Sequence, residues 1–470
     1  MQRGLYSTIL LSSLLTLGCT RVPEPGDQEV SAFVKNRVGS DVRWNQTSFK
    51  DEQVELSIKQ LIEKDLTCDS AVQIALLNSP KVQATFEQIG IAQADLVQAG
   101  LFKNPIFEGY VRFPEQSSFS VNSQFSVLQN FLDLFLIPLR KKVAAVEFEK
   151  AKLETTTLLL NLAFDVQHAF YLLAAEHKKC SLLKTQGELL LAQKDLARDQ
   201  KKQGNINHLE LQSRFKECLE LSVELQKSQI ERARLHEALN ALLGFQSNKA
   251  WKINTELPEH LEKLITSQFS ITALESIGLT QRLDLEIMRL EIERIKRLGV
   301  TKSWWSYTNL AGGISLEKDT DGARVIGPVL SAEIPILNYG QAERARLVAM
   351  YRQSVEELKE KEVQVLSEVR QAFTQLAMTR DLILTYRGKI LPLQKEIISM
   401  SQRYYNVMAM SVYKLLDAKK EELDMQLHYS QAIYSYVLSS IQLDRAIGGK
   451  LSLAEAWMTS EKEKVMESDS

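Results

Sequence analysis

Residues 119–127 read Phe-Ser-Val-Asn-Ser-Gln-Phe-Ser-Val, so apolar side chains hold most odd positions and polar ones the even positions. This period of two predicts a β-strand with one apolar face. Residues 106–113 alternate in the same way, and a short polar stretch separates the two segments. The sequence therefore predicts a β-hairpin with strands at about residues 105–113 and 119–128.

The same plan recurs 204 residues later in the chain. Leu310, Ile314 and Leu316 alternate with small or polar residues, which predicts strands at about residues 307–316 and 323–334. Identical residues at this offset are Leu211 and Leu415, Lys216 and Lys420, Leu219 and Leu423, Leu239 and Leu443, and Gly244 and Gly448. We therefore expect two structural repeats, residues 66–250 and 272–449, joined by a connecting segment at 251–271.

Long helices follow each predicted pair of strands. No proline occurs between Pro138 and Pro258, and leucine recurs every seven residues at Leu182, Leu189 and Leu196. A long proline-free run with coiled-coil spacing indicates helices rather than disorder. Each repeat therefore predicts a hairpin of two helices, at about residues 139–243 and 340–447. A helix of about 60 residues is about 90 Å long, more than a globular core needs. Pro392 is expected to kink the second hairpin.

The N-terminus has the pattern of an export signal. Arg3 precedes an apolar run, and Leu15-Thr16-Leu17-Gly18-Cys19 resembles a bacterial lipobox. We expect residues 1–18 to be removed and Cys19 to carry a covalent lipid at the start of an N-terminal segment, residues 19–65. The alternative is a plain signal peptide with Cys19 incidental. No later stretch approaches the roughly 18 apolar residues of a membrane-spanning helix, so any membrane crossing is expected to use β-structure.

Four strands cannot form a closed sheet in a membrane. An open edge leaves backbone groups without hydrogen bonds in hydrocarbon, and the smallest ordinary barrels have eight strands. We therefore expect several copies of the chain to assemble, each supplying a sector of one barrel. A soluble periplasmic coiled-coil scaffold is the alternative of another class. The net charge of −2 argues against a nucleic-acid partner.

Several motifs stand in an order and spacing typical of one family. They are residues 71–84 from Ala71 through Ser79-Pro80-Lys81-Val82, residues 92–105 ending in Asn104-Pro105, Ile334-Pro335-Ile336-Leu337-Asn338-Tyr339-Gly340, residues 405–418 from Tyr405-Asn406-Val407-Met408 to Asp417-Ala418, and Ile447-Gly448-Gly449. From about Leu66 to Gly449 the chain resembles the TolC family of outer-membrane efflux proteins.

This resemblance implies a fold class that combines α-helix with transmembrane β-structure. It implies a homotrimer with a twelve-stranded barrel in the outer membrane and a TolC-like tunnel of coiled-coil hairpins in the periplasm. The implied function is a passive exit duct without enzymatic activity or cofactor. The implied partners are a periplasmic adaptor and an inner-membrane pump of the resistance-nodulation-division or ABC type. The alternative within the family is the duct of a type I protein secretion system. The tail, residues 450–470, lies beyond the resemblance.

Candidate site residues lie near the turns of the two helical hairpins. Tyr413, Asp417 and Lys420 share one helical face by their i, i+4, i+7 spacing. They match the family positions that line the closed periplasmic aperture, where Tyr413 replaces a usual leucine and Lys420 a usual arginine. The alternative is an ordinary solvated helix face. The equivalent residues of the first repeat are Leu209, Ser213 and Lys216.

The turns themselves are expected to contact the adaptor. The residues are Gly204 and Asn205 in the first hairpin, and Met408 and Ser411 in the second. The family's turn glycine is retained as Gly204 but replaced by Met408 in the second repeat.

No sequence motif for catalysis or metal binding is found. The chain has no HExxH, GxGxxG, GxSxG or P-loop pattern, and no two of its six histidines have i, i+4 spacing. Met400, Met408, Met410 and Met425 leave a soft-metal site as an alternative to packing, and packing is favoured.

Overall fold

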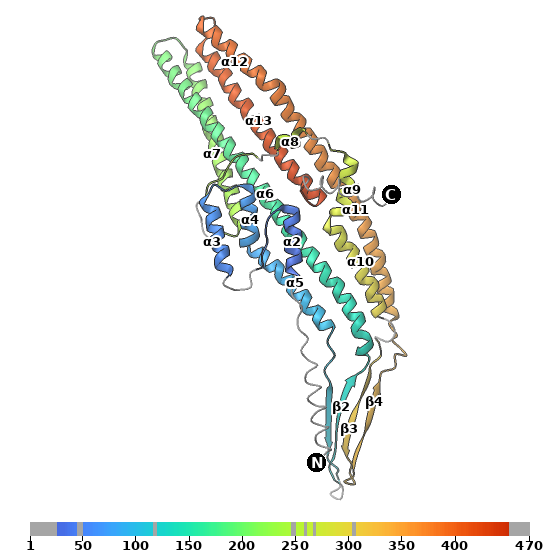
Figure 1. Cartoon of the computed structure of the whole chain (residues 1–470). Coiled ribbons are helices and arrows are strands. Elements are labelled where there is room, and N and C mark those ends of the chain that lie inside the picture. Colours follow the sequence, from blue (N-terminus) through green and yellow to red (C-terminus); the bar gives the residue numbers. More distant parts are fainter. Residues whose placement is uncertain are drawn as a thin grey trace. The chain divides into compact units, whose positions relative to one another are not determined.

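The structure is a computed structural model that describes residues 26–44, 50–115, 120–245, 251–257, 261–266, 269–302 and 307–450 (Figure 1). The predicted signal peptide, Cys19 and nearly all of the tail lie outside the described residues. The elements are α2 Asp27–Val38, α3 Lys50–Glu63, α4 Cys68–Asn78, α5 Pro80–Ala99, β1 Ile106–Arg112, β2 Asn122–Asn130, α6 Asp133–Lys202, α7 His208–Leu243, α8 Leu261–Thr266, α9 Ile271–Gln281, α10 Leu283–Thr301, β3 Leu310–Lys318, β4 Arg324–Ala332, α11 Gln341–Thr385, η3 Tyr386–Ile390, α12 Leu391–Asn406 and α13 Val412–Ile447.

The four strands form one antiparallel sheet in the order β1-β2-β3-β4. Its register aligns Phe107 with Val127, Val127 with Ile314, and Ile314 with Pro328. Because partners across a sheet share a face, apolar side chains from all four strands lie on one face. They are mostly exposed: Phe107, Val111, Phe125, Val127, Ile314, Leu316, Ile326 and Leu330. The predicted alternation is confirmed, and each strand lies within a few residues of its expected range.

Phe125 stabilises the middle of this face. It lies opposite Gly109, and a Cβ atom added to Gly109 would lie 2.8 Å from the Phe125 ring. The ring also stacks on Phe107, with centroids 6.0 Å apart. An aromatic ring over a cross-strand glycine fills the gap that the missing side chain leaves.

The internal repeat is visible in the order of the elements. In the first repeat α4 and α5 precede β1 and β2, and in the second repeat α9 and α10 precede β3 and β4. Each helix pair is interrupted by one residue with extended backbone, Ser79 in the first and Arg282 in the second. The break at Ser79 follows from Pro80, since a residue before proline avoids the helical region.

The long helix α6 begins earlier than expected, at Asp133 rather than near Leu139. The buried Asp133 carboxylate accepts a hydrogen bond from the Lys103 backbone N–H at 3.1 Å and pairs with Arg140 at 2.9 Å. A carboxylate is stabilised at a helix N-terminus, where backbone N–H groups lack partners. Pro138, only the sixth residue of α6, removes one hydrogen bond without ending the helix.

A change of helix type lies directly before Pro392 in the second hairpin. The five residues of η3, Tyr386–Ile390, form a π-helical segment, and the Leu391 N–H bonds five residues back to the Tyr386 carbonyl. Such π turns are a known response to an interrupted helical ladder. The structure thus changes helix type directly before Pro392, and the kink itself stays a prediction.

One expectation about membrane-spanning segments is wrong. An 18-residue stretch of α6 reaches a mean hydropathy of 1.4, so this helix is apolar enough by length and composition to cross a membrane. However, 61% of that stretch is buried inside the structure. Buried side chains of α6 include Leu159, Leu162, Phe164 and Phe170. Packing against protein therefore accounts for its hydropathy.

The chain divides into two compact units that cut across the repeats. The first contains Thr85–Thr155 and Leu283–Lys361 together with residues up to Val30, and the second contains Ser31–Ala84, Thr156–Arg282 and the residues from Glu362 onward. Each unit draws on both repeats, so the repeats are not separate domains.

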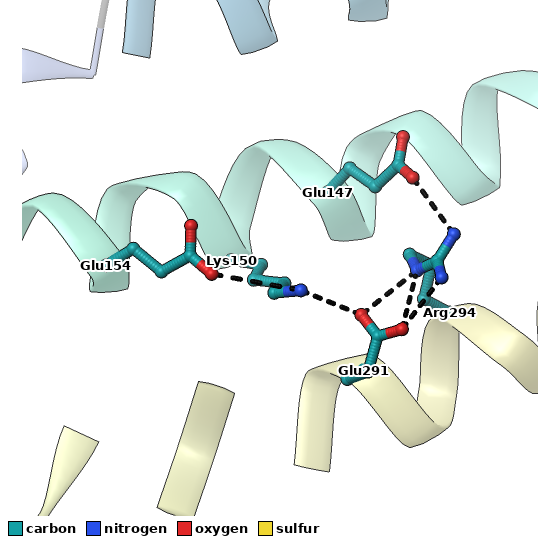
Figure 2. Close-up of polar contacts among 5 residues, drawn as sticks. All are labelled: Glu147, Lys150, Glu154, Glu291 and Arg294. Atoms are coloured by element: carbon teal, nitrogen blue, oxygen red, sulfur yellow. Dashed lines mark hydrogen bonds and ion pairs between the residues drawn. The ribbon is translucent and has the colours of Figure 1, made fainter. Parts of the chain in front are cut away.

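A network of charged side chains joins α6 to α10 within the first unit. The Glu291 carboxylate accepts hydrogen bonds from Lys150 at 2.8 Å and from Arg294 at 2.7 Å (Figure 2). Arg294 also donates a hydrogen bond to Glu147 at 3.2 Å. Hydrogen bonds from Arg294 and then Lys150 outweigh partial burial and lower the pKa of Glu291 to about 2.

We predict that Glu291→Gln destabilises the protein more at pH 7 than at pH 3. A depressed pKa contributes stability above the unfolded value of about 4.3, and this contribution is lost as the pH falls through about 2. Because the site is partly solvated, we expect a cost of about 1 kcal/mol at pH 7. Thermal unfolding in detergent at pH 7 and at pH 3 measures it. An equal effect of the substitution at both values contradicts this assignment.

Candidate functional site

The two hairpin turns have the same backbone structure. Gly204 and Met408 both have positive φ, 79° and 59°. The amides of Gly204 and Asn205 bond to the carbonyls of Lys201 and Gln200, and the amides of Met408 and Ala409 bond to the equivalent carbonyls of Tyr405 and Tyr404. This is the glycine-type end of a helix, in which the residue after the helix is left-handed.

The helices that leave these turns also start alike. The Asn207 side chain accepts from the Glu210 N–H at 2.8 Å, and the Ser411 side chain accepts from the Lys414 N–H at 3.4 Å. Ser411, which was predicted to contact the adaptor, is thus also the N-cap of α13.

Met408 is the only non-glycine residue with positive φ among the described residues. Its side chain is 95% exposed, so it makes little packing contact that offsets the strain. A left-handed backbone costs a residue with a Cβ atom about 1 kcal/mol.

A polar cluster connects the two hairpins a few residues from the turns, within the second unit. The residues of this inter-hairpin cluster are Gln193, Arg214, Glu217, Tyr413, Asp417 and Lys420. Two parallel hydrogen bonds join the Arg214 guanidinium to the Asp417 carboxylate, at 2.9 and 3.3 Å. Bidentate pairs of this kind are among the stronger polar contacts in proteins.

The other predicted site residues surround this pair. The Tyr413 ring is buried, and its centroid lies 5.2 Å from the Arg214 guanidinium. Lys420 reaches Glu217 at 3.9 Å, and Glu217 also lies 3.5 Å from Arg214. The structure therefore brings Tyr413 and Asp417 together around Arg214. Lys420 shares their helical face, but among the described residues its ion-pair partner is Glu217.

Arg214 remains charged although its side chain is only 15% exposed. Burial opposes the charge, but the hydrogen bond and attraction from Asp417, assisted by Glu217 and Glu210, raise the pKa of Arg214. Burial is also the main reason that the pKa of Tyr413 is raised. The cluster is thus a fixed cation held by carboxylates beside an aromatic ring.

Three buried polar atoms of the cluster, the Tyr413 hydroxyl, Gln193 Oε1 and Glu217 Oε2, have no hydrogen-bond partner in the described part of the chain. A buried polar group without a partner costs free energy. This cost weakens the contact that the cluster makes between the two hairpins.

The cluster belongs to a longer series of polar side-chain contacts between α6 and α13. Gln193 donates to Asp417 at 3.4 Å, and Gln186 donates to Asp424 at 2.7 Å. Arg445 pairs with Asp165 at 3.0 Å, three heptads further along both helices. Seven residues forward on α6 thus match seven residues back on α13, which is the register of an antiparallel coiled coil.

Arg214 was not identified from the sequence. Leu211 and Cys218 are seven residues apart in α7, the spacing of one core position of a coiled coil. Arg214 lies three residues after Leu211, which is the spacing of the other core position of the same heptad. A charge in an apolar seam needs a partner, so this position was a usable signal.

Within the described ranges, no group of three His, Cys, Asp or Glu side chains is placed to hold a metal ion. Met408 and Met400 are exposed. The turn residues Gly204 and Asn205 are exposed as well.

Comparison with known proteins finds a match over one segment of the chain and a shared fold over most of it. Residues 297–449 match the model of the outer membrane efflux protein family. No curated protein matches the sequence. The fold is similar to the Campylobacter jejuni CmeC outer membrane channel, with a TM-score of 0.65 and 15% identity, covering 84% of this chain and 89% of that one.

Two further solved structures have the same fold. The outer membrane protein VceC of Vibrio cholerae has a TM-score of 0.64 and 15% identity, with 82% of this chain and 96% of that chain covered. The open state of the Neisseria gonorrhoeae MtrE outer membrane channel has a TM-score of 0.64 and 13% identity, with 82% and 89% covered. The chain therefore has the TolC-like fold of outer-membrane efflux channels, and the resemblance predicted from the sequence is confirmed.

We predict that Met408→Gly makes the second turn more stable. Relief of the left-handed strain, offset in part by the freedom glycine gains when the turn opens, is worth about 0.5–1 kcal/mol. The Ala409 amide, which bonds to Tyr404 at 2.9 Å, should exchange with solvent about two- to fivefold more slowly. Hydrogen–deuterium exchange measures this rate. Gly204→Ala is the reverse control, and exchange unchanged by both substitutions rules out strain at these turns.

Proposed function

We propose that this chain is one subunit of a passive exit duct in the outer membrane, through which an efflux pump expels its substrates. The observation that carries the proposal is the exposed apolar face that crosses all four strands, from Phe107 in β1 to Leu330 in β4. Water does not stabilise such a face, but hydrocarbon does. The shared fold with outer-membrane channels supports the same function.

The proposed duct is a homotrimer. The strands β1 and β4 are the edges of the sheet, and edges in hydrocarbon must pair. Three copies supply twelve strands, which lies within the range of outer-membrane barrels. We assign a periplasmic adaptor to the hairpin turns, including Gly204, Asn205, Met408 and Ser411, and an inner-membrane pump behind the adaptor. Export of proteins by a type I secretion system is the second candidate.

The inter-hairpin cluster is the proposed gate of the duct. Each chain holds its second hairpin against its first through Arg214 and Asp417, with Tyr413 beside them. A charge-assisted contact of this exposure contributes about 1–2 kcal/mol, so three of them favour the closed state without locking it. An adaptor that binds the open arrangement better then shifts the population toward it.

We predict that Arg214→Gln and Asp417→Asn each raise single-channel conductance in planar lipid bilayers. Both substitutions remove the charge pair and keep the approximate side-chain size. Because they break the same contact, the double variant should conduct little more than either single variant. Additive effects would show that the two residues do not act as a pair.

The matched control is Ser213→Ala with Lys216→Ala at the equivalent positions of the first hairpin. Lys216 pairs only with the exposed Glu220 of its own helix among the described residues, at 3.4 Å. The control should conduct as the wild type does. Asp417→Ala with Lys420→Ala should raise conductance, since it removes the Arg214–Asp417 pair and also the contact of Lys420 with Glu217. If conductance stays at the wild-type level in every variant, the gate lies elsewhere.

The two faces of β2 should tolerate charge differently. Phe125→Arg places a cation on the apolar face and should cost about 2–4 kcal/mol per chain near the bilayer midplane. Gln124→Arg lies on the opposite face, beside Tyr110, and should be accepted. The amount of each variant in outer-membrane fractions measures the difference. Equal assembly of both variants contradicts a lipid-facing sheet.

We further propose that Cys19 carries the lipid anchor. Wild-type protein should incorporate labelled palmitate, and Cys19→Ala should not. Absence of label in the wild type rejects the anchor and leaves the exit duct unaffected, because the strands do not depend on it.

A further inference from the structure

A cavity of about 630 Å³ lies in the second unit, apart from the inter-hairpin cluster. It is open to solvent on one side and is lined by α6, α7, Asp65 and the connecting segment after residue 250. A parallel bridge holds that segment in place, since the Leu66 N–H donates to the Lys252 carbonyl at 2.7 Å and the Asn254 N–H to the Leu66 carbonyl at 2.9 Å. The volume is within the usual range for sites of small organic ligands.

One wall of the cavity is aromatic and fixed in orientation. The Trp251 indole stacks on the His236 imidazole, with centroids 4.3 Å apart and planes inclined by 10°. The indole N–H donates to the buried Asn240 side chain at 2.9 Å, and Asn240 also contacts His236 at 3.2 Å. The buried Leu173 adds an apolar side chain to the lining. The wall is therefore a preformed flat surface.

The rim of the cavity carries cations without counter-ions. Arg232 and Lys252 line it, and neither has an ion pair with another described residue. His177 also lines the cavity, and burial, followed by the nearby Arg232 and Lys184, lowers its pKa.

Two carboxylates also line the cavity. Glu237 already contacts Asn240 at 3.2 Å and His236 at 3.5 Å. Asp65 lies at the rim and has no ion pair within the described part of the chain.

We propose that this cavity binds a small organic anion with a flat ring, of the class of aromatic carboxylates. The carboxylate lies between Arg232 and Lys252, and the planar guanidinium can offer it two parallel hydrogen bonds. The ring lies along the surface formed by Trp251 and His236. Asp65 repels a second negative charge, so the site favours monoanions.

The test is binding of benzoate to the detergent-solubilised full chain, measured by isothermal titration calorimetry at pH 7. We expect saturable binding in the millimolar range, and weaker binding of acetate and of cyclohexanecarboxylate, which lack a flat ring. Arg232→Gln with Lys252→Gln should weaken benzoate binding at least tenfold. Absence of saturable heat with wild-type protein, or equal affinity for all three acids, overturns the proposal.

Two further variants separate binding from folding. Lys178→Gln with Lys179→Gln makes the same change of charge on α6 outside the cavity lining, and it should leave the affinity unchanged. Asp65→Asn removes the repelling carboxylate and should tighten binding about threefold. If the first of these weakens binding as much as the Arg232 and Lys252 change, or the second weakens it, the anion is not held in this cavity.

Discussion

The sheet β1-β2-β3-β4 has two edge strands with no second neighbour among the described residues, and one of its faces is apolar and exposed. Neither feature is stable in water for a single chain, because the edges present unpaired backbone groups and the face presents hydrocarbon side chains. In the proposed duct, copies of the chain remove the edges and lipid covers the face. Assembly is thus a condition for the rest of the proposed duct, including a gate built from three copies of the inter-hairpin cluster.

The helical hairpins depend on a different balance. Apolar side chains hold each pair of helices together. Polar contacts made by Asp165, Gln186 and Gln193 of α6 set the register of α13. Polar contacts in a coiled coil commonly fix register at some cost in stability. Near the turns, the last of these contacts is the Arg214–Asp417 pair. Buried polar atoms of Tyr413 and Gln193 beside it have no hydrogen-bond partner among the described residues. In the proposed gate this is the part of the contact that opens, and its unsatisfied buried groups favour opening.

Much of this architecture could be predicted from the sequence, because it rests on local periodicity. The period of two around Phe125 predicted the strands and their apolar face. The offset of 204 residues aligned Gly204 with Met408, and both residues have a left-handed backbone conformation in the structure. The start of α6 was missed because Asp133 is stabilised by Lys103, thirty residues earlier. Arg214 was missed because Asp417 is 203 residues away, and no local pattern connects them. The cavity beside Trp251 was missed for the same reason, since it needs α6, α7 and the connecting segment to meet.

The central claim is that one chain supplies only a sector of a closed barrel. Native mass spectrometry of the mature protein, released from outer membranes in mild detergent, tests this claim most directly. The proposed duct predicts a species with the mass of three chains that persists on dilution. A predominantly monomeric protein under these conditions contradicts it, because four strands cannot close alone.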